Sequence, residues 1–354
     1  MKKYLFFITI LFISCQEEIT LDLPNGEQKI VVQGTIENGL PPYVILTKNQ
    51  GYFEEIGINT YSNLFIDDVD SIKVWYIENE IEVVKYLTKI PKELAEALTG
   101  EDIPLYTSTD LFNYIYFNGE EYLINEYSFS KAGRTYFLEL NWNGKIVTAQ
   151  TTIPLPTPLD SLWVEKSENS EKDYKCDIRA VYSDPLDIQN NILIKSKRKE
   201  HYERDREHSD TTLCKIIPNP DINLKLVDAG SDVLINGETF ETYFPRPGDG
   251  GFPTGKYNAT HSKQCNDSIV NFNNDVVLIK FCQIDEPALR FWRGVVRQAG
   301  TNGNPFAEPL NLVSNINNGL GYWTGFGSVY YEVPIIENIV IKNQKDSLSI
   351  EDIF

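Results

Sequence analysis

Hydrophobic positions after residue 28 fall into short runs rich in β-branched and aromatic residues, and glycine, proline and asparagine separate these runs. Runs of this length and composition are typical of β-strands. Asn143 and Gly144 stand between two of them and favour a hairpin turn, because both residues tolerate positive φ. We therefore predict an immunoglobulin-like β-sandwich over residues 28–153. Its clearest strands are expected at 30–32, 43–46, 72–76, 136–140 and 146–149.

A proline-rich segment follows the predicted sandwich. Residues 154–159 hold three prolines within five positions, and proline both fixes the backbone φ angle and lacks an amide donor. Such a segment is stiff and extended, so we interpret it as a linker between two domains. Residues 160–354 carry further strand-like runs, which predict a second mainly β domain. These runs lie at 161–164, 176–181, 192–194 and 276–281.

Two helices are expected among the strands. The second domain should contain a helix from about 286 to 298, because hydrophobic residues recur there at three- and four-residue spacing and Gly300 follows as a terminator. A shorter helix is expected over 91–98, with proline at its start and Gly100 past its end. Residues 236–266 show no periodicity and are rich in glycine, proline, asparagine and aromatic residues. They predict a long surface loop of the kind that often carries binding.

The N-terminus has the pattern of a secretory signal. Two lysines precede a short apolar run, and Ser14 and Cys15 follow it. The run is too short to cross about 30 Å of hydrocarbon, so we interpret residues 1–14 as a cleaved signal peptide. Cys15 is placed like the acylated cysteine of a bacterial lipobox, with Phe12 where leucine is usual. We expect acyl chains on Cys15 to anchor the protein to a membrane.

The residues after Cys15 bear on the side of the membrane. Gln16, Glu17 and Glu18 open a tether that we expect to cover residues 15–27. An acidic cluster at this position looks like the signal that sends Bacteroidota lipoproteins to the outer face of the outer membrane. This pattern predicts an outer-membrane protein that faces the cell exterior. A solvated tether without a sorting role is the alternative.

The charge balance narrows the class of partner. The 354 residues include 51 acidic and 32 basic side chains, a formal net charge of −19. So acidic a surface repels phosphate backbones and anionic headgroups, which excludes nucleic-acid binding and requires that any membrane attachment be hydrophobic or covalent.

Four further cysteines lie in the predicted second domain, in a chain that the leader directs to an oxidising compartment. Four cysteines allow three pairings, and the sequence does not choose between them. We favour Cys176 with Cys282, because both lie in strand-like runs, and Cys214 with Cys265, which would close the ends of the loop region. The spacings fit no usual zinc pattern, so we predict no metal site.

No catalytic motif is found. The chain has neither the Gly-x-Ser-x-Gly elbow of covalent hydrolases nor the His-Glu-x-x-His helix of metallopeptidases. His201 and His208 lie in a highly charged segment that is better explained as a solvated loop or strand end than as a metal or catalytic pair. We therefore expect no cofactor and no enzymatic activity, while pairs of scattered carboxylates stay possible as a site.

Aromatic residues next to glycines are the main candidates for partner contacts. A loop of this composition could stack on a sugar or insert into a protein, whereas the alternative is a hairpin whose aromatic side chains line the core. The candidate loops are 236–266 and 302–327. The candidate residues in the second loop are Asn304, Pro305, Phe306, Tyr322, Trp323 and Phe326.

Several segments, taken in order, resemble one family. They lie at 29–36, 41–47, 133–138 and 153–154, and then at 291–292, 303–306, 308–309, 314–316 and 319–322. Together with Cys15 and its acidic cluster, they are similar to the Bacteroidota lipoprotein family catalogued as domain of unknown function 4249. Members tend to be encoded beside TonB-dependent outer-membrane receptors. The resemblance therefore implies a partner role in transport.

The main hypothesis is a non-enzymatic surface lipoprotein that docks on a TonB-dependent β-barrel and helps to capture or gate its cargo. The ligand and the identity of the barrel do not follow from the sequence. One alternative is a surface enzyme that acts on carbohydrate or peptide. Another is an adhesive or structural surface module.

Overall fold

The computed structural model describes most of the chain from residue 27 onward. The described residues are 27–50, 57, 60–108, 128–166, 176–186, 188–199, 201–203, 216–218, 221–233, 236–245, 262–265, 268–271, 275–301, 311–335, 338–349 and 352–353. The predicted signal peptide, Cys15 and the acidic cluster after it lie outside these ranges.

The described residues of the first half of the chain form seven strands and two short helices. The strands are β1 (Ile30–Glu37), β2 (Leu40–Lys48), β3 (Ser71–Glu78), β4 (Ile81–Lys89), β5 (Leu105–Ser108), β6 (Thr135–Trp142) and β7 (Lys145–Thr152), and the helices are α2 (Thr60–Leu64) and α3 (Lys92–Thr99). Asn143 and Gly144 both have positive φ, which confirms the predicted turn between β6 and β7. Gly100 ends α3 in the left-handed conformation, so this helix is also confirmed.

Over the part of the second half that the structure describes, there are twelve strands and the helix α5. The larger strands are β8 (Ser161–Lys166), β9 (Cys176–Ser183), β10 (Asn191–Lys199), β13 (Lys225–Ser231), β14 (Thr239–Pro245), β17 (Val276–Gln283) and β19 (Leu320–Pro334). The small ones are β11 (His201–Glu203), β12 (Ile216–Pro218), β15 (Ser262–Cys265), β16 (Ser268–Asn271) and β18 (Ile316–Asn317). Helix α5 (Glu286–Thr301) confirms the predicted helix and runs three residues further. No helix in the described part is long and apolar enough to cross a bilayer.

The mainly β fold is confirmed, but the loop prediction over 236–266 needs correction. Residues 239–245 form β14, which pairs along its whole length with β9, and β15 and β16 form a small hairpin. The polar and glycine-rich composition of this region hid the alternation of β14. Residues 246–261 lie outside the described part of the chain.

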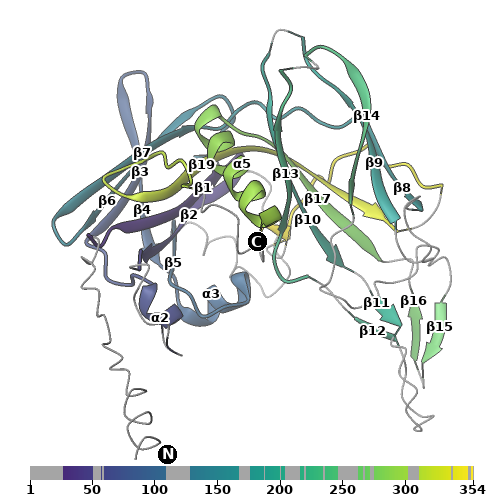
Figure 1. Ribbon diagram of the computed structural model, residues 1–354, viewed down its shortest axis with the longest axis horizontal. Helices are drawn as coiled ribbons and strands as arrows, with labels where there is room; N and C mark the ends of the chain where they lie inside the picture. Colours follow the sequence, from purple (N-terminus) through teal and green to yellow (C-terminus); the bar gives the residue numbers. More distant parts are fainter. Residues whose placement is uncertain are drawn as a thin grey trace, which may run out of the picture.

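One long strand belongs to both halves of the molecule. The first part of β19, from Leu320 to Phe326, pairs in parallel with β1, and the rest, from Gly327 to Pro334, pairs antiparallel with β17. A single sheet therefore runs through the molecule in the order β13-β10-β17-β19-β1-β2-β5-β4-β3-β6-β7-β18. Figure 1 shows this sheet continuing from one half into the other.

Two hydrophobic cores lie against one face of this shared sheet. Alternate residues of β19 point to the same side of a strand, so Trp323 joins the first core and Tyr331 joins the second. The first core lies between β19-β1-β2 and the strands β3, β6 and β7, while the second lies between β10-β17-β19 and the small sheet β14-β9-β8. The first core thus draws on residues from beyond the predicted linker.

The proline-rich segment lies across β19 and is held there. A Cβ on Gly325 would come within 2.5 Å of the Thr152 carbonyl oxygen, and one on Gly327 within 2.2 Å of the Pro154 carbonyl oxygen. The amide of Thr157 donates to Gln283 Oε1 (2.8 Å), and the amide of Leu159 donates to the Tyr331 hydroxyl (2.8 Å). The segment is extended, as its prolines require, and it is part of the packed structure.

We expect Gly327→Ala to lower the free energy of unfolding by about 2 kcal/mol or more, because backbone must move to admit the methyl group. Gly300→Ala is the matched control, since a Cβ there meets nothing within 4 Å. Urea denaturation of both variants measures the difference. Equal stability of the two variants would contradict the close packing of this segment on β19.

Candidate ligand-binding cavity

The second face of the shared sheet carries the helices and a cavity. Helix α5 covers β10, β13 and β19 through Leu289, Trp292 and their neighbours. Helix α3 and Ile353, near the C-terminus, cover β2 and β5 through a separate hydrophobic cluster. Figure 1 shows α5 lying between the two halves, with the C-terminus beside it. The sheet between these two coverings forms the floor of the cavity.

Asp285 fixes the start of α5 on this face. Its Oδ1 accepts the amide of Ala288 (3.0 Å), which is the bond expected of an N-cap. Its Oδ2 accepts the Thr151 hydroxyl (2.7 Å) and the amide of Thr152 (3.0 Å). The helix whose side chains pack against Tyr322 of the cavity is therefore tied to the end of β7.

The cavity has a volume of about 500 Å³, within the roughly 300 to 1,000 Å³ typical of small-molecule sites. Its floor comes from alternate residues of β1, β2, β10 and β19, and its sides come from α2, the end of α3 and the segment before β13. The lining combines three tyrosines with amide, hydroxyl and one lysine side chain. The principal residues are Gln33, Tyr43, Thr47, Tyr61, Thr99, Glu101, Lys195, Asn223 and Tyr322.

Aromatic contacts hold the tyrosines of the cavity in place. The ring of Tyr322 lies 4.7 Å from that of Phe291 and 5.0 Å from that of Trp292, measured between centroids. Across the cavity, the Tyr61 hydroxyl donates to Glu101 Oε2 (2.8 Å). The cavity thus has one wall anchored in the α5 core and a more exposed wall at α2.

A buried ion pair lies beside the cavity floor. Lys280 on β17 pairs with Glu37 on β1, and both side chains are almost completely buried. The Tyr330 hydroxyl donates to the second oxygen of Glu37 (2.7 Å). Burial lowers the pKa of Lys280, but the attraction of Glu37 outweighs it, so the net pKa is raised and Lys280 stays charged.

Lys195 is a second lysine in the same cluster, and it lines the cavity. It sits directly opposite Lys280 in the β10–β17 register. Its Nζ lies 4.9 Å from the ring centroid of Trp292 and 5.5 Å from that of Phe326. Among the described residues, no carboxylate lies within ion-pair distance of this amine, and no side chain or backbone oxygen accepts a hydrogen bond from it. Burial and the neighbouring Lys280 lower the pKa of Lys195 to about 8.

The thiol and the tyrosines of this cluster remain neutral near neutral pH. Burial raises the pKa of the Cys282 thiol to about 11, and it also raises the pKa values of Tyr43, Tyr322 and Tyr330. Lys195 is therefore the member of this cluster whose charge changes near pH 8.

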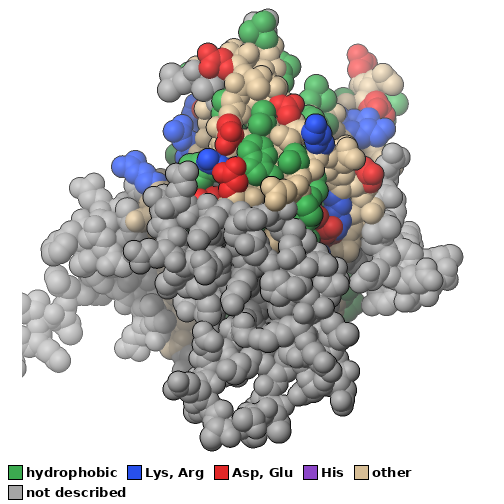
Figure 2. Space-filling model, turned by 90° about the vertical axis from the view of Figure 1, so that its right-hand side faces the viewer, with side chains coloured by type: hydrophobic (Ala, Val, Ile, Leu, Met, Phe, Trp, Pro, Cys, Tyr) green, Lys and Arg blue, Asp and Glu red, His purple; other side chains and the backbone are tan. Residues whose placement is uncertain are grey.

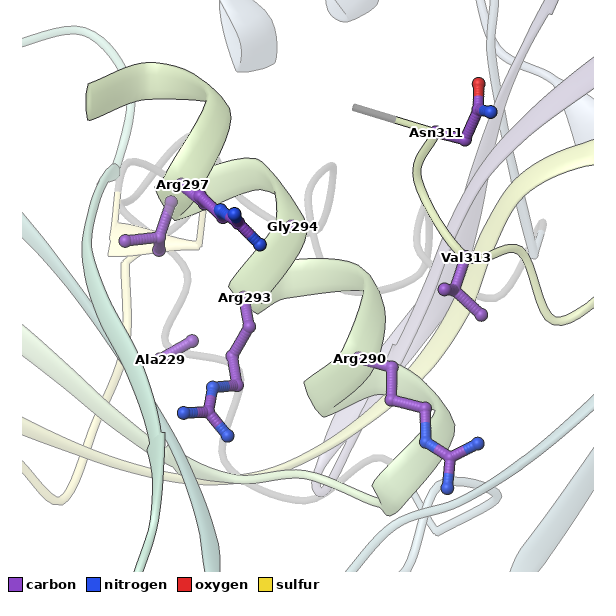
Figure 3. Close-up of a pocket in the computed structure, with 8 residues that line it drawn as sticks. Ala229, Arg290, Arg293, Gly294, Arg297, Asn311 and Val313 are labelled. Atoms are coloured by element: carbon purple, nitrogen blue, oxygen red, sulfur yellow. The ribbon is translucent and has the colours of Figure 1, made fainter. Parts of the chain in front are cut away.

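A second hollow, of about 520 Å³, lies along the outer side of α5. Figure 3 shows Arg290, Arg293 and Arg297 projecting from α5, between Ala229 on one side and Asn311 and Val313 on the other. Arg290 pairs with Glu286 one turn earlier (3.0 Å), whereas Arg293 and Arg297 make no ion pair with any described residue. We call this feature the α5 arginine groove.

The end of the molecule formed by the second half has a different surface. Figure 2 shows acidic and basic side chains interspersed with hydrophobic ones over the described part of that face. Charges of one sign do not gather there as they do in the α5 arginine groove.

The predicted partner-binding residues fall into three groups. Tyr322 lines the cavity. Trp323 and Phe326 are 0% and 1% exposed, so their prediction as partner contacts is wrong: they lie in the middle of β19 and pack into the cores on its two faces. Asn304, Pro305 and Phe306 lie outside the described residues.

The favoured pairing of Cys176 with Cys282 is also wrong. Cys282 is a buried free thiol that accepts a hydrogen bond from the Ser328 hydroxyl (3.3 Å). It faces α5, whereas its neighbour Phe281 faces the core that contains β9. The alternation of β17 therefore turns Cys282 away from the strand that carries Cys176. Cys214, and the side chains of Cys176 and Cys265, lie outside what the structure describes.

A match to a known protein family shows which family the chain belongs to. The model of the family described as "Domain of unknown function (DUF4249)" matches residues 16–330. The chain belongs to this family. The match includes every residue of the cavity floor, while Ile353, which also lines the cavity, lies beyond it. No curated protein matches the chain.

Sequence reasoning missed the lysines of the site. Lys280 interrupts the otherwise apolar run of β17, and Lys195 follows the apolar residues of β10. A lysine inside a buried strand is a usable signal, because an amine there needs a partner or an open space. Pairing Lys195 with Lys280 needed the strand register, which the sequence does not supply.

We expect Glu37→Gln to destabilise the protein by about 3 kcal/mol, because it leaves the Lys280 ammonium buried without its counter-charge. Glu82→Gln is the matched control, since Glu82 pairs with Lys73 but is about half exposed, and such pairs contribute little. Thermal unfolding measures both. A change no larger in Glu37→Gln than in the control would contradict the buried ion pair.

Proposed function

We propose that this DUF4249 protein is a non-enzymatic, lipid-anchored protein of the outer membrane that captures a small ligand for a TonB-dependent β-barrel. The observation that carries this proposal is the cavity on the shared sheet. It has the volume of a small-molecule site, an aromatic wall and convergent polar groups on rigid strands. Among the described residues, no group of three or more His, Cys, Asp or Glu side chains could hold a metal ion.

The proposed location rests on the N-terminal sequence. The basic residues, the short apolar run and Cys15 support export and acylation, and Gln16, Glu17 and Glu18 support display on the outer face. A covalent lipid suits a protein with a net charge of −19, because anionic headgroups would repel it.

The α5 arginine groove is the surface that we propose for the barrel. Guanidinium groups bind carboxylates with good geometry and are common at protein interfaces. Two arginines on one helix that make no ion pair with any described residue, in so acidic a chain, favour a partner surface that carries carboxylates. The groove lies outside the cavity lining, so partner and ligand would occupy different surfaces.

The first test is a crosslinked, detergent-solubilised pull-down through a C-terminal tag, read by mass spectrometry. We expect the wild type to recover a TonB-dependent barrel. We expect Cys15→Ala to leave the membrane fraction and to lose the barrel, because the acyl chains bring the two proteins together. A wild-type protein that is recovered alone would count against the barrel partner and in favour of a surface enzyme or an adhesive module.

The second test asks whether the groove makes the contact. We expect Arg293→Glu combined with Arg297→Glu to lower recovery of the barrel at least about tenfold, because like charges then face each other across the interface. Lys131→Glu combined with Lys342→Glu is the matched control, with the same change in net charge at exposed positions elsewhere. Equal loss in both double variants would show a non-specific charge effect.

A further inference from the structure

We propose that the cavity binds an organic anion whose apolar or aromatic body packs against the tyrosines and whose acidic group pairs with Lys195. This inference rests on the proposed function and specifies the ligand class of its cavity. Carboxylates and sulfonates share this chemistry. The acidic group would sit at the floor, where β10 and β19 bring Lys195 and Tyr322 to the same lining.

The charged side chains at the cavity floor do not balance one another. Lys195 and Lys280 stand directly opposite each other, but Glu37 is the one carboxylate among the described residues that acts on both, and it is bonded to Lys280 and Tyr330. An ammonium group in such surroundings is costly unless an anion pairs with it. Counted over the described residues, and with Lys195 protonated, the cluster therefore carries one positive charge more than its carboxylate balances.

A counter-ion can approach the Lys195 ammonium group from one direction. Lys195 lies over the rings of Trp292 and Phe326 on its protein side. The space that remains open to its amine is the cavity. Glu101 also lines the cavity, but it is exposed on the α2 side and holds the Tyr61 hydroxyl. An anion in the cavity would thus be repelled by Glu101 on the α2 side and attracted by Lys195 at the floor.

The lining of the cavity also bears on the body of the ligand. Tyr43, Tyr61 and Tyr322 give the cavity three rings, and Tyr322 is fixed by Phe291 and Trp292. Fixed aromatic walls favour flat or apolar groups. The amide and hydroxyl groups of Gln33, Asn223 and Thr47 can then orient polar substituents.

Affinity for an anion should depend on pH through Lys195. The groups that face Lys195 from the surrounding elements are Lys280 and Cys282 on β17, Glu37 on β1, Tyr43 on β2, Tyr322 and Tyr330 on β19, Leu226 on β13 and Trp292 on α5. The tyrosines and the thiol stay neutral and Lys280 stays charged through neutral pH. Lys195 is charged below its pKa of about 8 and neutral above it, so affinity should fall as the pH rises through this value.

Two fluorescent probes test the assignment in the folded, tagged protein. Anilinonaphthalene sulfonate carries an anionic group, and phenylnaphthylamine has the same aromatic body without it. We expect the wild type to bind one equivalent of the sulfonate about tenfold or more tightly than the neutral probe at neutral pH, the size of one charge-assisted contact. This preference should shrink as the pH is raised from about 7 to about 10, because Lys195 loses its proton over this range while the sulfonate keeps its charge.

Lys195→Met is the decisive variant. We expect it to fold with equal or higher thermal stability, because a partly buried ammonium group without a counter-ion among the described residues is replaced by an apolar chain, and to lose both the preference for the sulfonate and its pH dependence. Lys195→Gln provides a second, polar variant with the same expectation. Lys342→Met is the control, since Lys342 is exposed and does not line the cavity.

The outcomes separate this inference from the proposed function. Equal binding of the two probes, binding of neither, or an unchanged preference in Lys195→Met would each overturn the anion site. If the pull-down still recovers the barrel in that case, the accessory role stands without this ligand class. A preference for the sulfonate that depends on Lys195, in a protein that recovers no barrel, would support the anion site and overturn the transport partnership.

Discussion

The backbone pairing of β19 with β1 on one part and β17 on the other is the interaction on which the rest of the structure depends. Because one strand serves both halves, the shared sheet is continuous and its two faces have fixed roles. One face carries both hydrophobic cores, with Trp323 in the first and Tyr331 in the second. The proline-rich segment lies over this strand at Gly325 and Gly327, where a side chain would block it. The two halves are therefore joined by a packed sheet and not by a connecting peptide alone.

The site follows from the alternation of the same strands. If every second residue of β1, β10, β17 and β19 faces the cores, the residues between them must face α5 and the cavity. That second set includes Glu37, Lys195, Lys280 and Tyr322. Burial destabilises each charged group, so Glu37 and Lys280 pair with each other, and the second carboxylate oxygen of Glu37 accepts a hydrogen bond from Tyr330. Lys195 is left with aromatic rings on one side and open volume on the other. The cavity is thus a consequence of the fold. It also contains the Lys195 amine, which has no counter-charge among the described residues.

Much of the local structure could be predicted from the sequence, because its causes are local. The hairpin at Asn143-Gly144, the termination of α3 at Gly100 and the amphipathic pattern of α5 all depend on neighbouring residues. The shared strand could not be predicted, since the glycines of 320–327 resemble a loop until the proline-rich segment that crosses them is known. The disulfide predicted for Cys282 was wrong for a different reason. The face of β17 that this residue occupies depends on long-range packing, which the sequence does not show. The pairing of Lys195 with Lys280 is likewise a long-range fact, and so the cavity itself was missed.

The central claim is that Lys195 presents a proton-bearing amine to a cavity that accepts an anion. The most direct measurement is a carbon-13 NMR titration of the lysine side chains, with Lys195 assigned from the signal that Lys195→Met removes, in the presence and absence of anilinonaphthalene sulfonate. The account predicts a midpoint near pH 8 for Lys195 in the free protein and a clear upward shift when the anion is added. A midpoint in the ordinary lysine range of about 10.4, unchanged by the anion, would contradict it.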